Sequence, residues 1–368
     1  MKENKKMLAN ASQWRLMWMR FKRHKLALVS AIFLVVLYSA ALVCGFVAPY
    51  NPDWRNVHAI QAPPQGLHFV RPDGSFNLRP FVYGYVLNYN KKKWWERNYS
   101  KNSQKVYPIR FFCKGQKYKL WNLIETDTHL FTVEKGGYIH LAGTDRLGRD
   151  MFSRIMYGAR ISLTIGLVGV VLTFILGVTL GGIAGYIGGW VDALLQRSIE
   201  ILKSIPDLPL LMTLSAAVPV TWSPLMVYFG ITTLLSFFNW MGLARVVRSK
   251  FLSLRGEDFV VAARLLGASR SRIVFKHLLP LFMSHIITSA TLSIPEMILG
   301  ETMLSFLGIG LRPPVVSWGV LLQQAQNYQA VMLTPWLLIP GGFVVAVVLA
   351  FNLLGDGLRD AADPYTAR

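Results

Sequence analysis

Six apolar segments constrain this chain more than any other feature. They lie at residues 26–47, 161–183, 208–220, 225–243, 281–304 and 335–354. Most are close to the ~20 residues that a helix needs to cross a bilayer, while the third is short and flanked by prolines. Lipid offers no hydrogen-bond partners to a bare backbone, so a chain crosses it as helices or as a closed barrel. The segments therefore predict an all-α polytopic membrane protein with six transmembrane helices.

Composition agrees with a membrane protein. Hydrophobic residues make up 53% and charged residues 16% of the 368, whereas a soluble domain has about 45–50% and about 25%. The net charge of +20 could indicate a nucleic-acid partner. However, the basic residues lie mostly at the membrane flanks and in one polar loop, with no recognised nucleic-acid motif, so we expect no nucleic acid. Two cysteines, Cys44 and Cys113, do not make a disulfide framework.

Basic residues in short loops predict the orientation. They crowd residues 1–25 and the loop between the fourth and fifth segments. In residues 1–25, Trp14, Trp18 and Phe21 recur at helical spacing, which indicates an amphipathic arm on the inner membrane surface; a disordered basic tail is the alternative. Both termini should then be cytoplasmic.

This topology divides the chain into four parts. They are the cytoplasmic arm at 1–25, the first transmembrane helix at 26–47, an extracytoplasmic loop domain at 48–157 and a core at 158–368 with the other five transmembrane helices. In the loop domain, residues 107–113 and 117–121 read as one hairpin and residues 130–133 and 138–141 as another. We expect a small, mostly β insertion between helices 1 and 2.

Residues 258–280 form a short basic segment between two of the apolar runs. Residues 259–266 predict a helix, and Gly267 suits the left-handed residue that ends it. Ser269 can cap a second helix running toward Leu279, and Pro280 suits the first turn of the next membrane helix. The prediction is a helix–turn–helix knuckle at the membrane face, shaped to press into a groove on a soluble partner.

The knuckle resembles the "EAA" loop of type I ABC importer permeases. The match is Ala262, Ala263, Gly267, Leu279 and Pro280, while Val261 stands where the family has its leading Glu. The resemblance implies an ATPase-coupling loop, and a plain structural turn is the alternative. The residues that would form the coupling loop are Asp258, Ala262, Ala263, Gly267, Ala268, Leu279 and Pro280.

A second motif, HLAGTDRLGRDMFSRIMYGARISL at 140–163, leads into the second apolar segment. Thr144, Asp145, Gly148, Arg149 and Asp150 supply capping and turn chemistry there. The series is similar to the signature of the second (C-type) permease of dipeptide and oligopeptide ABC importers. The resemblance covers the chain except most of the loop domain. Residues 188–206, which include Asp192, match that family's first cytoplasmic loop and are interpreted as a brace for the knuckle or as a simple polar turn.

Small and acidic residues within the segments allow further expectations. Gly177, Gly181, Gly185 and Gly189 recur every four residues along and just beyond the second segment, which predicts close helix packing. Glu296 and Glu301 lie in or just beyond the outer half of the fifth segment. Carboxylates at membrane depth usually face protein or a water-filled path. They are interpreted either as part of a translocation path or as structural hydrogen-bonding groups against a partner permease.

The resemblance implies a set of partners in a bacterial cytoplasmic membrane. They are a second permease subunit, two cytoplasmic ATPase subunits, an extracytoplasmic substrate-binding protein and the lipid bilayer itself. The chain has no Gly-x-x-x-x-Gly-Lys-Ser/Thr phosphate loop and no His-Glu-x-x-His or Cys-x-x-Cys pair, so we expect no catalytic residues, cofactor or metal.

Two other classes remain as alternatives. A self-contained secondary transporter or channel should carry inverted repeats and paired charges at mid-membrane. A membrane-anchored receptor would bind its ligand with the long loop and would not need six spans. Within the importer class, the sequence leaves open dipeptides, longer peptides, peptide antibiotics, oligosaccharides and nickel complexes.

Overall fold

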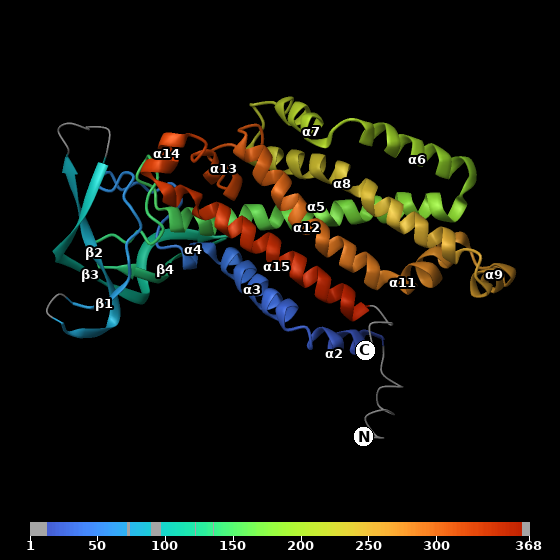
Figure 1. Ribbon diagram of the computed structural model, residues 1–368, viewed down its shortest axis with the longest axis horizontal. Helices are drawn as coiled ribbons and strands as arrows, with labels where there is room; N and C mark the ends of the chain where they lie inside the picture. The colour runs from blue at the N-terminus through green and yellow to red at the C-terminus, as the bar shows by residue number, and fades with distance from the viewer. Residues whose placement is uncertain (1–12, 72–73, 90–96, 122, 135, 363–368) are drawn as a thin grey trace, which may run out of the picture. The chain divides into compact units, whose positions relative to one another are not determined.

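A computed structural model describes residues 13–71, 74–89, 97–121, 123–134 and 136–362 (Figure 1). The chain divides into two compact units. The first contains Met1–Val35, Thr164–Leu304 and Val345–Arg368, and the second contains Val36–Leu163 and Ser305–Val344. The first twelve residues of the predicted amphipathic arm lie outside the described residues.

The described residues are mostly helical, and four helical stretches are long and apolar enough to cross a membrane. They are α3 (Lys25–Leu42), α5 (Met151–Ile187), α8 (Pro224–Leu254) and Pro335–Ala361, which combines η2 (Pro335–Leu338) with α15 (Ile339–Ala362). A fifth candidate is broken, because Arg270–Leu281 and His285–Phe306 are bent by 75°. The described part of the chain thus has four or five candidate spans.

The remaining helices are short, apart from α12. They are α2 (Gln13–Phe21), α4 (Cys44–Val47), α6 (Gly189–Ser204), α7 (Asp207–Ala216), α9 (Asp258–Leu265), α10 (Arg270–Arg272), the π-helical η1 (Ile273–Leu278), α11 (Leu279–Leu281), α12 (Met283–Phe306), α13 (Trp318–Gln323) and α14 (Tyr328–Leu333). The predicted third span corresponds to α7, whose ten residues cover only about 15 Å.

Helix α5 begins ten residues before the predicted second span. Asp150 explains the difference, because its carboxylate Oδ2 accepts a hydrogen bond of 2.7 Å from the backbone N–H of Ser153. A side-chain acceptor in this position satisfies one of the free N–H groups at a helix start. The helix therefore begins outside the apolar run and is 37 residues long.

The N-terminal helices pack against the C-terminal one in the first unit. Phe21, Ala27 and Ala361 form a small buried cluster. Trp18 stacks on Phe21 with 5.9 Å between ring centroids but stays exposed itself. Helix α2 therefore has one packed residue, Phe21, and an exposed tryptophan next to it on the helix surface.

The second unit contains a four-stranded antiparallel sheet in the order β1-β2-β3-β4 (Figure 1). The strands are β1 (His68–Val70), β2 (Phe76–Tyr89), β3 (Arg97–Leu120) and β4 (Ile124–Val133). Its core includes Tyr50, Val82, Ile109, Phe131 and Ile139, all buried. The predicted small β element is therefore present as a sheet.

The strand pairing differs from both predicted hairpins. Residues 107–120 belong to one strand, β3, and the register only shifts between Lys114 and Tyr118, where a turn was predicted. Gly115 thus lies in an irregular part of a long strand, since pairing with β4 resumes after the shift. Residues 130–133 lie in β4, but residues 138–141 form no strand.

Candidate functional site

The knuckle, residues 258–280, begins with α9 and ends that helix as the sequence predicts. Gly267 has φ of +76°, in the left-handed region. The N–H of Ala268 donates to the carbonyl of Ala263, and the N–H of Gly267 donates to the carbonyl of Arg264, both at 3.0 Å. These two bonds form a Schellman motif, which satisfies carbonyls at the helix end and turns the chain sharply.

The second half of the knuckle starts at the predicted cap. The Ser269 hydroxyl oxygen accepts a hydrogen bond of 3.3 Å from the N–H of Arg272. The helix then passes into a π-helical segment, where the N–H of Leu279 bonds to the carbonyl of Val274, five residues earlier. Pro280 lacks the N–H that would continue an α-helical ladder, which accounts for the irregular path.

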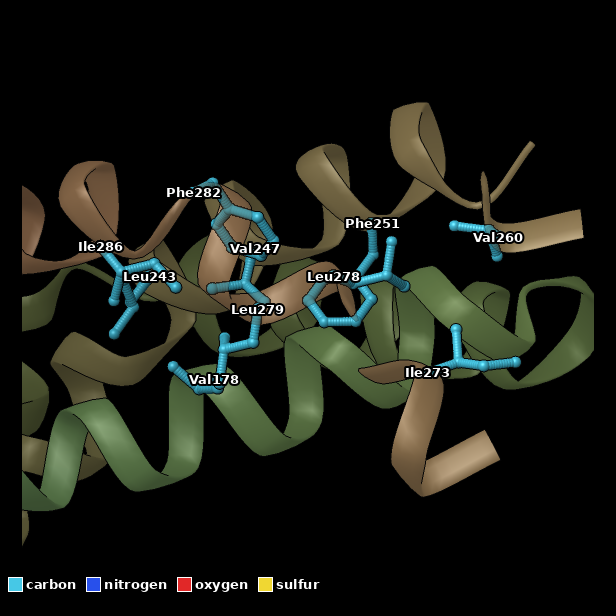
Figure 2. Close-up of a cluster of buried hydrophobic side chains, with 10 residues drawn as sticks. All are labelled: Val178, Leu243, Val247, Phe251, Val260, Ile273, Leu278, Leu279, Phe282 and Ile286. Atoms are coloured by element: carbon cyan, nitrogen blue, oxygen red, sulfur yellow. The ribbon is translucent and has the colours of Figure 1, made fainter. Parts of the chain in front are cut away.

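A cluster of ten buried side chains packs the knuckle against the neighbouring helices of the first unit (Figure 2). They are Val178, Leu243, Val247, Phe251, Val260, Ile273, Leu278, Leu279, Phe282 and Ile286. The cluster takes residues from α5, α8 and both halves of the knuckle, and the rings of Phe251 and Phe282 meet edge to face at 5.4 Å. Burial of this many apolar side chains makes the knuckle a rigid extension of α5 and α8.

The turn of the knuckle is apolar and exposed. Leu265 and Leu266, immediately before Gly267, are 83% and 88% exposed. Phe259 and Val261 are also exposed large apolar residues on the same short helix. A set of exposed apolar side chains on a rigid element is typical of a protein-binding surface.

The predicted coupling residues divide between these two faces. Asp258, Ala262, Gly267 and Pro280 are exposed. Ala263 and Ala268 pack against the buried cluster, and Leu279 belongs to it. Sequence reasoning did not identify Leu265 and Leu266, although an apolar pair directly before a helix-ending glycine outside the apolar runs was a usable signal.

A polar hollow of about 510 Å³ opens beside the turn. Its lining residues are Tyr186, Ile187, Arg264, Ala268, Ser269, Arg270 and Ile273. The Arg264 guanidinium lies over the Tyr186 ring, 6.0 Å from its centroid. Arg264 and Arg270, beside the exposed apolar turn, can donate hydrogen bonds to carboxylates or carbonyls on a partner's surface.

Asp192 of α6 contacts the helix that carries the knuckle. Its carboxylate accepts two hydrogen bonds from the guanidinium of Arg248 in α8, one of them 2.6 Å from Nη2 to Oδ2. Hydrogen bonding to Arg248 lowers the pKa of Asp192 below its ordinary value. Residues 188–206, interpreted from the sequence as a brace for the knuckle or as a simple polar turn, thus contact α8 through Asp192.

The two carboxylates of α12 lie in different surroundings. Glu301 is fully buried within the first unit, whereas Glu296 is exposed. The structure does not bring them into one site. Across the described residues, no group of three or more His, Cys, Asp or Glu side chains is arranged to hold a metal ion.

The second motif forms a buried polar junction at the start of α5. Asp145 is fully buried, and its carboxylate accepts hydrogen bonds from Arg149 Nε at 2.8 Å and Arg154 Nη1 at 2.6 Å. Thr144 bonds to the backbone of Ala59 and Ala62. The motif therefore ties residues 59–62 to the first turns of α5.

Asp150 extends this junction with another buried contact. Its Oδ1 lies 2.9 Å from His140 Nδ1, and its Oδ2 caps the helix. The sequence indicated capping and turn chemistry here but not the buried pairing of Asp145 with Arg154.

Comparison with known protein families gives two matches to this chain. Residues 177–368, more than half of the chain, match the inner membrane component of binding-protein-dependent transport systems. Residues 12–64 match the N-terminal transmembrane domain of oligopeptide transport permease C.

Relatives with assigned names agree with these matches. The chain is 39% identical to the dipeptide transport system permease protein of Bacillus subtilis over 231 residues, which are 62% of this chain and 70% of the relative. It is 39% identical to the oligopeptide transport system permease protein of Haemophilus influenzae over 250 residues, which are 66% of this chain and 74% of the relative.

The candidate spans and the knuckle together describe a polytopic membrane protein with an exposed helix–turn–helix segment between two of its helices. The chain belongs to the family of inner membrane components of binding-protein-dependent transport systems. The resemblance to C-type peptide permeases is confirmed, and the chain is a transport subunit rather than an enzyme.

Proposed function

We propose that this chain, with a second permease subunit, forms the translocation pathway of an ABC importer for peptides or peptide-like solutes, and that residues 258–280 couple the pathway to ATP hydrolysis. One observation carries the coupling proposal. The knuckle is fixed on α5 and α8 by a buried cluster, while Leu265 and Leu266 at its turn are exposed. A rigid element with an exposed apolar tip can transmit the movement of a docked partner.

The docking partner is a cytoplasmic ATPase subunit, one of two in the complex. Leu265 and Leu266 would enter a groove on its surface, and Arg264 and Arg270 would contact polar groups beside them. When ATP binding draws the two ATPase subunits together, the knuckle follows and pulls α5 and α8 through the buried cluster. Such rigid-body movement switches a pathway between its two open states.

Six crossings account for the orientation. They are α3, α5, α8, α12, α15 and a short third crossing at α7. The third crossing is short because α7 has ten residues, about 15 Å of helix, and α6 before it carries charged residues up to its last turn. With the N-terminus cytoplasmic, the C-terminus, the knuckle and Asp192 lie on the cytoplasmic side, and 48–157 forms the extracytoplasmic insertion.

The substrate class follows from the relatives, whose names describe dipeptide and oligopeptide transport. An extracytoplasmic binding protein would deliver the substrate. Glu296, which is exposed, is the better candidate for the translocation path. The burial of Glu301 supports a structural role.

The test is co-purification of the ATPase subunits with full-length protein expressed in its own host, together with peptide uptake. Gly267→Val should abolish uptake and release the ATPases while the protein still inserts into the membrane. The physical reason is conformational: φ of +76° disfavours a β-branched residue, although nothing lies within 4 Å of the position that a Cβ would occupy.

Gly267→Asn is the matched control, because asparagine tolerates the left-handed region and should retain coupling. Leu266→Asp should release the ATPases without affecting the fold, since the side chain is exposed, whereas Leu266→Met should not. Full uptake by Gly267→Val would exclude the coupling role. Absence of ATPase partners from the wild type would favour a self-contained transporter.

A further inference from the structure

Three contacts join the sheet of the second unit to the end of α3 and the residues just after it. His129 of β4 lies against the Ala48 carbonyl, with 2.6 Å from its Nδ1 to that oxygen. The Tyr118 ring packs on Gly45, so closely that a Cβ there would lie 2.4 Å from the ring. Trp121 donates a hydrogen bond of 2.9 Å from Nε1 to the Leu42 carbonyl.

Leu42 is the last residue of α3, an apolar helix of 18 residues and about 27 Å. This length approaches the ~30 Å of a bilayer's hydrocarbon core. Since α3 crosses the membrane, Leu42 lies at the boundary between hydrocarbon and headgroups. The hydrogen bond holds Trp121, at the turn between β3 and β4, at that same boundary.

The turn presents apolar side chains at this level. Leu123 is 82% exposed, and Ile124, Trp121 and Phe112 are also exposed. Phe112 lies beside the turn of α4, with its ring 6.0 Å from that of Phe46. Tryptophan and other apolar side chains beside the end of a spanning helix are typical of a membrane interface.

The backbone supports a specific role for two of these rings. Phe112 and Trp121 both have φ of +51°. Bulky residues rarely adopt this left-handed conformation, and such outliers persist where the surroundings enforce them. This backbone conformation directs the Phe112 ring toward Phe46 of α4 and the Trp121 ring toward Leu42 at the end of α3.

The charge of the strand fits an anionic lipid surface. β3 contains basic residues but no acidic ones. Lys117 and Lys119, both exposed, precede the turn. Lys117 Nζ lies 4.0 Å from Glu125 Oε1 of β4, and Lys119 lies opposite Glu125 in the strand register. An exposed pair of this length is weak, so it does not hold the ammonium groups away from headgroups. Lysine side chains extend from apolar surroundings toward phosphate headgroups.

We propose that the β3–β4 turn is a membrane anchor: Phe112, Trp121, Leu123 and Ile124 insert into the bilayer interface beside α3, and Lys117 and Lys119 contact anionic phospholipid headgroups. The anchor fixes the sheet against the membrane at the outer end of the first span. A soluble protein is the less favoured occupant, because it would have to reach the headgroup level at Leu42 to cover these side chains.

The test places a fluorophore at the turn of the full-length protein in lipid nanodiscs. Leu123→Cys is combined with Cys113→Ser, whose hydroxyl can donate to the Arg110 backbone carbonyl as the thiol does. Cys44 is buried and left in place. A bimane label at position 123 should lose several-fold of its fluorescence in phosphatidylethanolamine–phosphatidylglycerol nanodiscs containing lipid brominated near the headgroup end of its acyl chains.

Leu78→Cys on β2 is the control. Leu78 is 87% exposed and apolar, like Leu123, but lies in another strand. It should be quenched by aqueous iodide and not by brominated lipid. Labels at 123 and at Ile124→Cys that respond only to iodide would overturn the anchor. A label at 123 protected from both quenchers would also overturn it, because a protein surface would then cover the turn.

Discussion

Asp192 and Arg248 are joined by two hydrogen bonds that connect α6 to α8. Val247 and Phe251 of α8, on either side of Arg248 in sequence, belong to the buried cluster that holds the knuckle. The carbonyl of Arg248 also lies against Gly185 of α5, 2.7 Å from the position of an added Cβ. One arginine thus connects α5, α6 and α8 where the knuckle is attached.

Loss of this pair should destabilise the protein only modestly. Both side chains are partly exposed, so Asp192→Ala and Arg248→Ala should each cost about 1 kcal/mol of unfolding free energy. The two effects should not add, because each variant removes the same contact. Thermal unfolding in detergent of the two single variants and the double variant measures the coupling. Strictly additive losses would contradict a direct brace.

The same pair predicts a defined pH dependence. Arg248 lowers the pKa of Asp192 in the folded state, so the pair stabilises the protein at pH values above the unfolded pKa of about 3.9. This contribution is lost as pH falls through the lowered folded value. The difference in unfolding temperature between wild type and Asp192→Asn should therefore be constant from neutral pH to about pH 5 and shrink below about pH 4. A difference that changes between pH 6 and 8 would point to another group.

Local chemistry made the knuckle predictable. The left-handed Gly267 and the Ser269 cap depend on residues within four positions of them, so the sequence alone indicates both. The π-helical segment was not predicted, because it depends on how the chain accommodates Pro280 while Ile273 and Leu278 remain buried.

Long-range pairing set the limit of prediction elsewhere. Gly115 between two β-rich runs indicates a turn, but β4 pairs with β3 on both sides of it, and the strand continues. Likewise, Asp145 and Arg154 are nine residues apart, and their contact depends on how the loop folds onto α5. Such contacts are properties of the tertiary fold and leave little local signal.

The glycine series of α5 can be tested by adding one methyl group. At Gly181, a Cβ would lie 2.4 Å from the Ala244 carbonyl oxygen of α8. The α8 backbone at Ala244 can make room for this methyl group only if α5 and α8 move apart. Gly181→Ala should therefore cost roughly 1–3 kcal/mol of unfolding free energy. Gly242→Ala is the control, because nothing lies within 4 Å of its added Cβ. Alanine there should stabilise the helix by about 0.5–1 kcal/mol. Thermal unfolding should thus shift in opposite directions, and equal shifts would exclude close packing at Gly181.

The buried junction before α5 allows a comparison of two aspartates. Asp145→Asn removes the charge that compensates Arg149 and the buried Arg154, which should cost about 3–5 kcal/mol. Asp150→Asn should cost less, about 1–2 kcal/mol, because asparagine caps a helix nearly as well as aspartate and what is lost is one buried charge-assisted contact, to His140. Both substitutions preserve size and remove one charge, so the contrast reports the arginines that only the Asp145 carboxylate compensates.

The measurement is unfolding of each purified variant in the same detergent, alongside Asp145→Asn combined with Arg154→Met. Removing the uncompensated guanidinium should restore part of the lost stability, since methionine fills similar volume without a buried charge. If Asp145→Asn and Asp150→Asn proved equally mild, Arg154 would not depend on the Asp145 carboxylate, and the junction would be held by its backbone hydrogen bonds alone.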